Sequence, residues 1–480
     1  MNRFRVLLQL LPALTIAALA ICLVATPAHA ATSGKGLQAG AAVADITPTE
    51  WPIFLRGQFN PRPANSSHDP LQACAIALQN GAGRAVIVTV DSVGVSRETF
   101  DAAKLRAAEK TGWKPGQMLI AATHTHSAPT SSGGGPAPRV AYAERFSEGV
   151  VQAIVDAVGN LEPAQAGWAS DEVTDEVFNR RWHLQAGKMP LNPFGEIDKV
   201  KMNPPRSLIV SPAGPTDPEV AVLDIRTSKK KPLALLANYA LHYVGATPRD
   251  QVSADYFGEF RRLMPSRLGR NTPTNFVALM SNGTSGDINN IDFRGKRAPR
   301  ETFEQIRLVA AKVADAAWRA RREMKYESNV PVKMVQREIK LKWRKPTPDL
   351  IARAKMILAM TDGEKKKLPR LAENYASRTL SQAAREGTAD AIIQAIRIGD
   401  QAIVSMPFEV LVEIGLEIKE KSPFKNTIIM ELANGSYGYL PPPHQHELGG
   451  YETWLGTSRV QKDASEILTR NLLEMLTELR

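Results

Sequence analysis

Apolar, β-branched segments alternate with segments of helical periodicity in the first part of the chain. Residues 84–95 read RAVIVTVDSVGV, and a helical pattern follows at 97–111. Residues 118–127 form a second apolar segment, and a helical pattern follows from about 139 to 159. Strands that alternate with helices are typical of folds that combine both elements around one core. We therefore predict a mixed α/β (α+β) fold.

Further strands are predicted later in the chain. Residues 219–227 and 232–242 read as two paired strands joined by a basic turn. Residues 275–280 and 427–433 are two more apolar strands, and a terminal helix is expected from about 462 to 479. No internal repeat and no linker interrupts this order. We therefore expect one large domain.

The stretch 345–387 differs in character from its surroundings. It is rich in Ala, Lys, Arg and Glu, it has helical periodicity, and it contains no strand signal. Strand-like segments flank it at 333–343 and 389–407. We expect a helical insertion near 345–387 within the large domain.

The first 30 residues have the three parts of a secretory signal. Arg3 and Arg5 give a basic start, residues 7–24 an apolar run, and Ala28-His29-Ala30 small residues at the cleavage positions. An uncleaved membrane anchor is the alternative, since the run approaches the ~18 residues that a span needs. The small residues favour a signal peptide, 1–30, with cleavage after Ala30. We expect a periplasmic or secreted protein with one domain over 31–480.

Charge and cysteine content narrow the possible partners. The formal net charge is +11, and much of the surplus lies in short runs such as 229–231 and 365–367, which are typical of solvated surfaces. No nucleic-acid-binding module is recognisable, so no nucleic-acid partner is expected. A basic surface suits peripheral contact with anionic membranes or with acidic substrates. Cys74 lies in an apolar run, which predicts a buried strand position. The oligomeric state is left open.

Of the eight histidines, one lies in the signal, and three of the others follow apolar strands. His124 and His126 are two apart at the end of 118–127, a spacing that puts both side chains on one face of a strand. His242 ends the segment 235–242. The ends of buried strands are where α/β proteins place their sites. These histidines can share a metal or bind substrate, and each could also be a hydrogen-bonded core group.

A catalytic zinc takes about three protein ligands and leaves a position for water. Since the chain has no set of thiolates, histidines with a carboxylate are the natural choice. Glu409 follows the strand 402–406 and a proline. Asp91, Asp255 and Asp287 occupy similar strand-end or loop positions, and the residues alone do not choose among these four carboxylates.

A series of short motifs runs in order along the chain from about Gly40 to Trp454. They are Ala44-Asp-Ile-Thr-Pro48, His68-Asp-Pro-Leu71, Thr123-His-Thr-His-Ser-Ala-Pro129, Asn179-Arg180, Asn238-Tyr-Ala-Leu-His242, Ser253-Ala-Asp-Tyr256, Gly286-Asp287, Pro407-Phe-Glu409, and Asn434-Gly-Ser-Tyr-Gly-Tyr439 through Gly450-Tyr-Glu452. Each motif is short, but the ordered set resembles the N-terminal catalytic domain of the neutral/alkaline (non-lysosomal) ceramidase family. The resemblance implies a single large ceramidase-like domain and a zinc-dependent hydrolase that cleaves an amide (N-acyl) bond with zinc-activated water.

The resemblance also implies a set of metal ligands. One Zn²⁺ per chain would be bound by His124, His242, Glu409 and Tyr439. Tyr439 is preferred to Tyr437 because it lies 12 residues before Tyr451, the family's interval between its two site tyrosines.

Three catalytic roles follow from the same resemblance. His126 would act as an acid/base group that also contacts substrate. Arg180 would orient the substrate, with Arg181 beside it as the alternative. Tyr451 would stabilise the oxyanion.

Two departures from the family keep the substrate open. The family's Gly-Asp-Val-Ser-Pro-Asn motif becomes Gly286-Asp-Ile-Asn-Asn290, so Asn289 stands where the family has a serine implicated in amide cleavage. Asparagine is no nucleophile, but it can donate a hydrogen bond to substrate or oxyanion. The chain ends 29 residues after Tyr451, so no C-terminal immunoglobulin-like domain is expected.

Several functions therefore stay open. The substrate is a small-molecule or lipid-like acyl compound, with ceramide as one candidate. A zinc-dependent esterase or amidase that acts on a polar, non-sphingolipid substrate is an alternative. A non-catalytic exported metal- or lipid-binding protein is another.

Overall fold

Two β-sheets form the centre of the protein. The structure, a computed structural model, describes residues 36–57, 61–295 and 300–480, so the predicted signal peptide lies outside it. The larger sheet has nine strands, eight of them in the order β16 (Val277–Asn282), β14 (Pro232–Tyr239), β13 (Glu219–Thr227), β8 (Glu162–Glu172), β1 (Gln38–Asp45), β5 (Gln72–Asn80), β6 (Gly83–Val90) and β7 (Met118–Ala122), with β18 (Tyr326–Glu327) paired to β8. The smaller sheet has the order β19 (Val332–Lys342), β20 (Thr388–Ile398), β21 (Gln401–Ser405) and β23 (Asn426–Met430).

The parallel strand pairs lie at the edges of the two sheets. Most neighbouring strands are antiparallel, but β6–β7, β14–β16 and β21–β23 are parallel. The segment after β23 joins the two sheets, because the N–H of Ala122 donates to the carbonyl of Leu432 at 3.1 Å and that of Asn434 to Ile120 at 2.9 Å. The carboxyl end of β7 is thereby brought beside the chain that follows β23.

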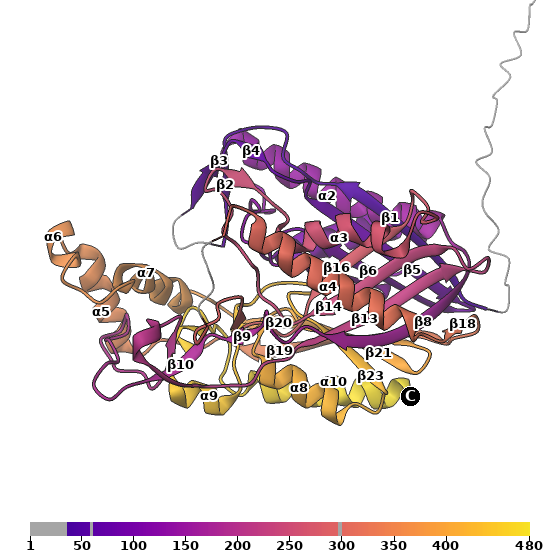
Figure 1. Ribbon diagram of the computed structural model, residues 1–480. Coiled ribbons are helices and arrows are strands. Elements are labelled where there is room, and N and C mark those ends of the chain that lie inside the picture. The colour runs from indigo at the N-terminus through magenta and orange to yellow at the C-terminus, as the bar shows by residue number, and fades with distance from the viewer. Residues whose placement is uncertain (1–35, 58–60, 296–299) are drawn as a thin grey trace, which may run out of the picture. The chain divides into compact units, whose positions relative to one another are not determined.

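Helices cover the outer faces of both sheets, and the inner faces pack on each other. A buried cluster between the sheets joins Ile76 and Ile87 of the larger sheet to Ile403 and Ile428 of the smaller one. The outer helices are α1 (Arg97–Thr111) and α2 (Ala137–Gly159) over β5–β7, α3 (Asp255–Leu268) and α4 (Glu304–Arg322) over β13, β14 and β16, and α8 (Val412–Lys421) and α10 (Ala464–Leu479) under the smaller sheet. Figure 1 shows the resulting order of layers as helix, sheet, sheet, helix.

Strand β5 shows how the sequence sets these layers. Successive side chains of a strand point to opposite faces. Cys74 and Ile76 face the second sheet, whereas Ala73 and Ala75 face the helix layer, where small side chains let α2 approach. Close approach is also required at Gly40, where a Cβ would lie 2.2 Å from the carbonyl oxygen of an α2 residue. Cys74 is buried, as its apolar run predicts.

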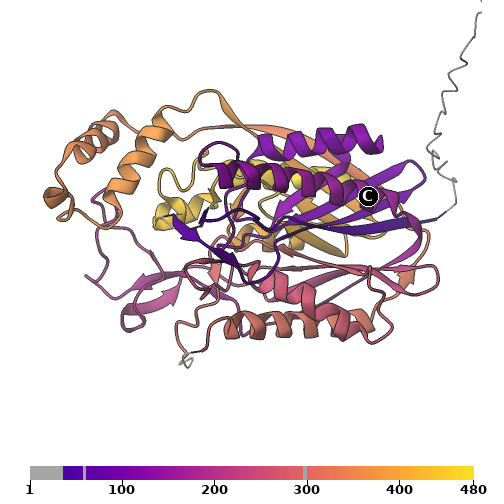
Figure 2. The same cartoon turned by 90° about the horizontal axis from the view of Figure 1, so that it is seen from above.

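Three helices leave the smaller sheet between β19 and β20. They are α5 (Pro348–Ala359), α6 (Asp362–Lys365) and α7 (Ala372–Ala383), and α5 and α7 share a small apolar cluster of their own. Figures 1 and 2 both show them together at one end of the sheets, near β10 (Arg181–Leu184) in Figure 1. Tyr375 anchors them, because its hydroxyl lies 2.5 Å from Thr457 Oγ1 and its ring meets the edge of Trp454.

The predicted fold class is confirmed, since helices and strands mix around shared cores. The strand-like stretch 389–407 forms two antiparallel strands, because Gly399 adopts a φ of 64° and turns the chain between β20 and β21. The second of them, β21, corresponds to the strand predicted at 402–406. Among the described residues, no helix is both long and apolar enough to cross a membrane.

Candidate metal centre and active site

His124 lies in a turn beyond the end of a strand. Strand β7 stops at Ala122, and His124 has a φ of 74°, a left-handed conformation that is uncommon outside glycine. Its N–H donates to the carbonyl of Ser92 at 2.9 Å, so the chain follows the loop after β6. The prediction that His124 and His126 share one face of a strand is therefore wrong. Their rings nevertheless meet, with Nε2 atoms 3.1 Å apart.

His124 and His242 present their Nε2 atoms to each other. The Nδ1 atom of His124 contacts the carbonyl oxygen of Val93, and that of His242 lies 3.1 Å from the carbonyl oxygen of Ser285. Since a carbonyl oxygen only accepts, each Nδ1 carries the proton, and each neutral ring has a lone pair on Nε2. The two Nε2 atoms are 2.9 Å apart. Two lone pairs at this distance repel unless a proton or a metal cation lies between them.

Glu409 completes a set of donor atoms around this point. It lies on β22 (Glu409–Val410), which pairs in parallel with β24 (Tyr439–Leu440) so that Glu409 faces Tyr439. Its Oε2 is 3.3 Å from Nε2 of His124 and 3.7 Å from Nε2 of His242. Imidazole nitrogens with a carboxylate oxygen are common zinc ligands. The donor set therefore fits a metal such as zinc.

Two neighbouring glutamates favour a positive charge on His124. Burial lowers the pKa of His124, but the carboxylates of Glu409 and Glu431 outweigh burial and raise it. Burial, together with His124 and Arg180, holds the pKa of His242 well below its ordinary value, so this ring stays neutral. Burial raises the pKa of Glu409, but His124 outweighs that effect and keeps the carboxyl ionised.

His126 is the third member of the cluster. The ligating nitrogens of His124, His126 and His242 lie within 4.8 Å of one another, a group that could hold a metal ion. The ring of His126 stacks on Tyr243 with centroids 3.9 Å apart. Its Nδ1 lies against the backbone of Gly57, but no hydrogen bond of normal geometry reaches it from the described residues. Burial, together with the charges of His124 and Arg180, holds the pKa of His126 well below its ordinary value, so this ring is neutral.

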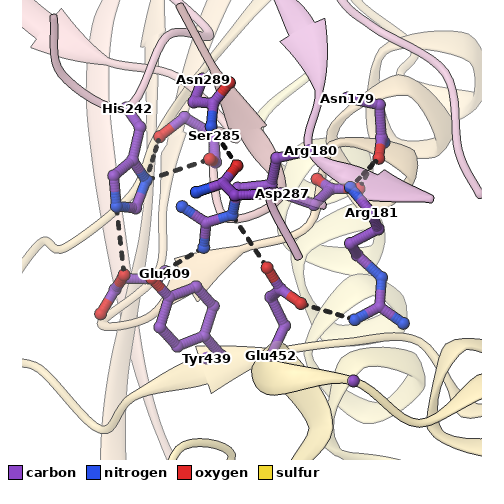
Figure 3. A network of polar contacts seen from close by, with 12 residues as sticks. Asn179, Arg180, Arg181, His242, Ser285, Asp287, Asn289, Glu409, Tyr439 and Glu452 are labelled. Carbon is purple, nitrogen blue, oxygen red and sulfur yellow. Dashed lines mark hydrogen bonds and ion pairs between the residues drawn. The ribbon is translucent and has the colours of Figure 1, made fainter. Parts of the chain in front are cut away.

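The sequence did not decide which of two adjacent arginines lies at the site, and their contacts in the structure distinguish them. The guanidinium of Arg180 donates to Tyr439 Oη at 3.0 Å and to Glu452 Oε1 at 2.8 Å. Arg181 donates to the other carboxylate oxygen of Glu452 at 2.6 Å and to the carbonyl of Gly449 at 2.7 Å. Figure 3 shows Arg180 between Tyr439 and Glu452, and Arg181 beyond Glu452. Arg180 is therefore the arginine at the site.

Two buried glutamates support the site, and sequence reasoning gave neither a role. Glu431 accepts from Val410 N at 2.7 Å and from Ser285 Oγ at 2.6 Å, so it ties the residue next to Glu409 to the partner of His242. Burial raises the pKa of Glu431 to about 8. The sequence could have indicated Glu431, because a glutamate is unusual inside the apolar run 427–433. Glu452 is part of the last motif, but no role was assigned to it.

The three rival carboxylates are engaged elsewhere. Asp91 forms a buried ion pair with an arginine of α3. Asp255 accepts backbone N–H groups at 3.1 and 2.8 Å from the loop after His242. Asp287 accepts the backbone N–H at the start of α8 at 2.9 Å. Of the four candidates, Glu409 is the one whose carboxylate faces the histidines.

The side-chain amide of Asn289 contacts other parts of the chain. It ends the short strand β17 (Ile288–Asn289), its Nδ2 donates to Asn203 Oδ1 at 2.6 Å, and its Oδ1 accepts from Ile291 N at 3.0 Å. Both ends of the amide are thus engaged within the protein. Figure 3 shows Asn289 on the far side of Arg180 from Tyr439.

A cavity of about 400 Å³ opens over the cluster. Its lining includes His124, His126, Glu409, Tyr439 and Tyr451, together with Arg56, Gly57, Val93, Gly94, Val95, Ser96, Thr130, Ser131, Ser132, Arg378, Ser436 and Arg459. Tyr451 enters from the short 3-10 helix Tyr451–Thr453, with its ring edge-on to Tyr439 at 5.5 Å between centroids.

A larger cavity of about 590 Å³ lies beside α3 and α4. Among the described residues, the cluster of three metal-capable side chains lies under the smaller cavity. The smaller cavity is therefore the candidate active site.

Two solved structures share this architecture. Neutral ceramidase from Pseudomonas aeruginosa matches with a TM-score of 0.68 and 16% identity over 93% of this chain and 75% of that chain. A ceramidase complexed with C2 matches with a TM-score of 0.68 and 15% identity over 93% of this chain and 76% of that chain. No family model matches, and no curated relative is found. As its motifs predict, the chain has the fold of a neutral ceramidase.

Proposed function

We propose that this chain is a zinc-dependent hydrolase that cleaves an amide (N-acyl) bond. One observation carries the proposal: the Nε2 atoms of His124 and His242 face each other at 2.9 Å, beside the carboxylate of Glu409. Each ring also has the backbone carbonyl partner that metal-binding histidines require on their second nitrogen. A buried arrangement of this kind is stable when a cation occupies it.

His124, His242 and Glu409 would hold the zinc, and Tyr439 would be the fourth ligand. Bound zinc supplies a Lewis acid and lowers the pKa of a water from about 15.7 to about 7. Val93 and Ser285 orient the two imidazoles through their carbonyls. These contacts support the proposal that the two imidazoles are held in place before any metal binds.

The remaining side chains act on the substrate. Tyr451 lines the cavity, and we assign its hydroxyl to the oxygen that becomes negative during the reaction. Arg180 holds the hydroxyl of Tyr439 at 3.0 Å and adds positive charge at that side. His126 lines the same cavity, and we assign to it the proton that the leaving amine must gain.

We also propose that the protein is exported. Residues 1–30 carry a basic start, an apolar run and a small-residue cleavage motif. Cleavage after Ala30 would leave Ala31 at the new N-terminus, which N-terminal sequencing of the periplasmic or secreted protein tests directly. Peripheral contact with an anionic membrane stays a prediction from charge.

The test combines metal analysis with hydrolysis of matched N-acyl and O-acyl substrates. We expect stoichiometric zinc and amide hydrolysis in the wild type, and loss of both in His124→Ala and His242→Ala. His68→Ala is the control, because this exposed histidine stacks on Phe303 outside the cluster, and it should keep both.

A wild-type protein that lacks metal under replete conditions would contradict the proposal. So would two site variants that keep their metal. Zinc with ester hydrolysis but no amide hydrolysis would favour the esterase alternative.

A further inference from the structure

The walls of the cavity over the histidines are polar and cationic. Arg378 and Arg459 line it together with serine and threonine hydroxyls, and Val93 and Val95 are its branched apolar side chains. Glu409, which faces the histidines, is the one carboxylate among the described lining residues. Pockets that hold long hydrocarbon chains are lined mainly by apolar side chains. This cavity is instead lined mainly by polar and cationic side chains.

Arg459 is a half-buried cation without a described counter-ion. Its Nε donates to the carbonyl of Gly456 at 3.4 Å, and no described carboxylate forms an ion pair with it. Burial lowers its pKa, and the like charges of Arg385 and Arg378 lower it further, whereas Glu409 across the cavity offsets only part of this effect. A guanidinium in such surroundings gains most from an anion that binds to it.

Arg378 reaches the same cavity from the helical insertion. It lies on α7, and its Nη1 is 3.3 Å from two neutral oxygens, Tyr375 Oη and Thr457 Oγ1. A Cβ at Gly456 would lie 2.9 Å from Cβ of Arg378, so α7 packs closely on the chain just before Arg459. The insertion therefore places a second guanidinium at the wall of the candidate active site.

A neighbouring cleft does not share this excess of positive charge. This cleft of about 440 Å³ shares Arg459, but its lining includes the carboxylates of Glu98, Asp101 and Asp390. Three arginines line the cavity over the histidines: Arg56 is exposed, whereas Arg378 and Arg459 are half-buried in its wall. The size of the cavity suits a small molecule.

We propose that the substrate is a small amide that carries a carboxylate, which Arg378 and Arg459 bind in the same cavity as the histidines. This inference rests on the proposed function of the cluster as a hydrolytic metal centre. The carboxylate can belong to the amine half, as in an N-acyl amino acid, or to the acyl half, as in the monoamide of a dicarboxylic acid.

The test compares pairs of substrates that differ in one charge. N-acetylglycine and N-octanoylglycine are measured beside their glycinamides, and succinamic acid beside its methyl ester. The wild type should favour the anionic member by at least about tenfold in kcat/KM, since a hydrogen bond to a charged group contributes about that much.

Three arginine variants test which side chains cause the preference for the anionic substrate. In Arg378→Gln and Arg459→Gln, the ratio of anionic to neutral kcat/KM should fall toward one, mainly through KM. Arg459→Lys keeps the charge and should restore part of the ratio. Arg353→Gln is the matched control, because this arginine of α5 lies against Gly195 outside the cavity, and its ratio should stay unchanged.

A binding measurement separates this inference from the proposed function. Calorimetry with N-acetylglycine should show binding to His124→Ala, which lacks turnover, and none to the Arg378→Gln, Arg459→Gln double variant. Binding without hydrolysis of any amide in wild type would overturn the function and leave the anion site standing. Hydrolysis with equal kcat/KM for charged and neutral members, or preferred hydrolysis of a neutral N-acyl sphingosine, would overturn the anion site alone.

Discussion

The floor of the candidate active site (His124, His242 and Glu409) and its wall (Arg378 and Arg459) are built in different ways. Each imidazole of the floor is oriented by a backbone carbonyl, and both rings are almost fully buried. The wall arginines are half-buried, and their guanidiniums contact neutral oxygens from a helix and a loop. The floor has the fixed geometry that chemistry requires, whereas the wall has long side chains that can adjust to a ligand.

This difference assigns separate tasks to the two regions. Substitutions in the floor should change metal content, stability or kcat for every substrate. Substitutions in the wall should change which substrate is preferred. The predictions below address the floor and its supports, from the largest expected effect to the smallest.

Removal of the charge of Glu452 should have the largest effect. This fully buried carboxylate accepts from both Arg180 and Arg181, so Glu452→Gln would leave two buried guanidiniums without a counter-ion. We expect the free energy of unfolding to fall by about 3–5 kcal/mol in urea denaturation. The control Glu474→Gln breaks a surface pair with Arg337 and should cost less than about 1 kcal/mol. Equal losses of unfolding free energy in Glu452→Gln and Glu474→Gln would contradict the special role of this buried ion pair.

Loss of one hydroxyl at the cavity should reduce turnover without loss of metal. We expect Tyr451→Phe to lower kcat by about 10²–10³-fold, as removal of an oxyanion donor does. Tyr437→Phe is the control, because that hydroxyl donates to the carbonyl of Asp390 at 2.9 Å in the neighbouring cleft. Full turnover by Tyr451→Phe would remove Tyr451 from the reaction.

Lys104 is buried against the segment that follows β23, and it predicts a pH dependence. Its ammonium donates to Asn434, in the segment that follows Glu431, and burial lowers its pKa from 10.5 to about 8. The charged groups near it are Asp101, which raises the pKa, and Arg97, which lowers it.

Between pH 8 and 10.5 the unfolded chain therefore binds a proton that the folded chain does not, so stability rises with pH. Over this window the free energy of unfolding of wild type should rise by about 3 kcal/mol relative to Lys104→Met. Parallel curves for the two proteins would show that Lys104 keeps an ordinary pKa.

The smallest effect is expected from Glu431, which holds residues next to the proposed ligands. Glu431→Gln disturbs the hydrogen bonds to Ser285 and Val410, which position the partner of His242 and the neighbour of Glu409. We expect zinc affinity to fall by about 10–100-fold in a chelator competition, as for other residues that orient metal ligands. An unchanged zinc affinity would show that the backbone alone fixes the ligands.

Local periodicity predicted the helices and strands well. It failed where contacts between distant parts of the chain determine the end of an element. The helix at 97–111 has the expected bounds, because its pattern and its cap are local. The strand expected at 118–127 stops at Ala122, because the N–H of His124 finds the carbonyl of Ser92 instead of a strand partner. That acceptor belongs to the loop after another strand, which no local pattern reveals.

The site residues show the same limit. Motif order pointed to His124, His242 and Glu409, and the structure brings these three together. The choice between Arg180 and Arg181 needed Glu452, which is 272 residues from Arg180 along the chain. The sequence did not reveal the polar wall either, since Arg378 reaches the cavity from the segment 345–387, which was predicted only to be a helical insertion.

The most direct test of the metal centre is anomalous diffraction at the zinc edge from crystals of the metal-replete protein. A peak bonded to Nε2 of His124, Nε2 of His242 and a carboxylate oxygen of Glu409 is the predicted result. Histidines joined only by a shared proton, with no peak at these atoms, would contradict a zinc-dependent hydrolase.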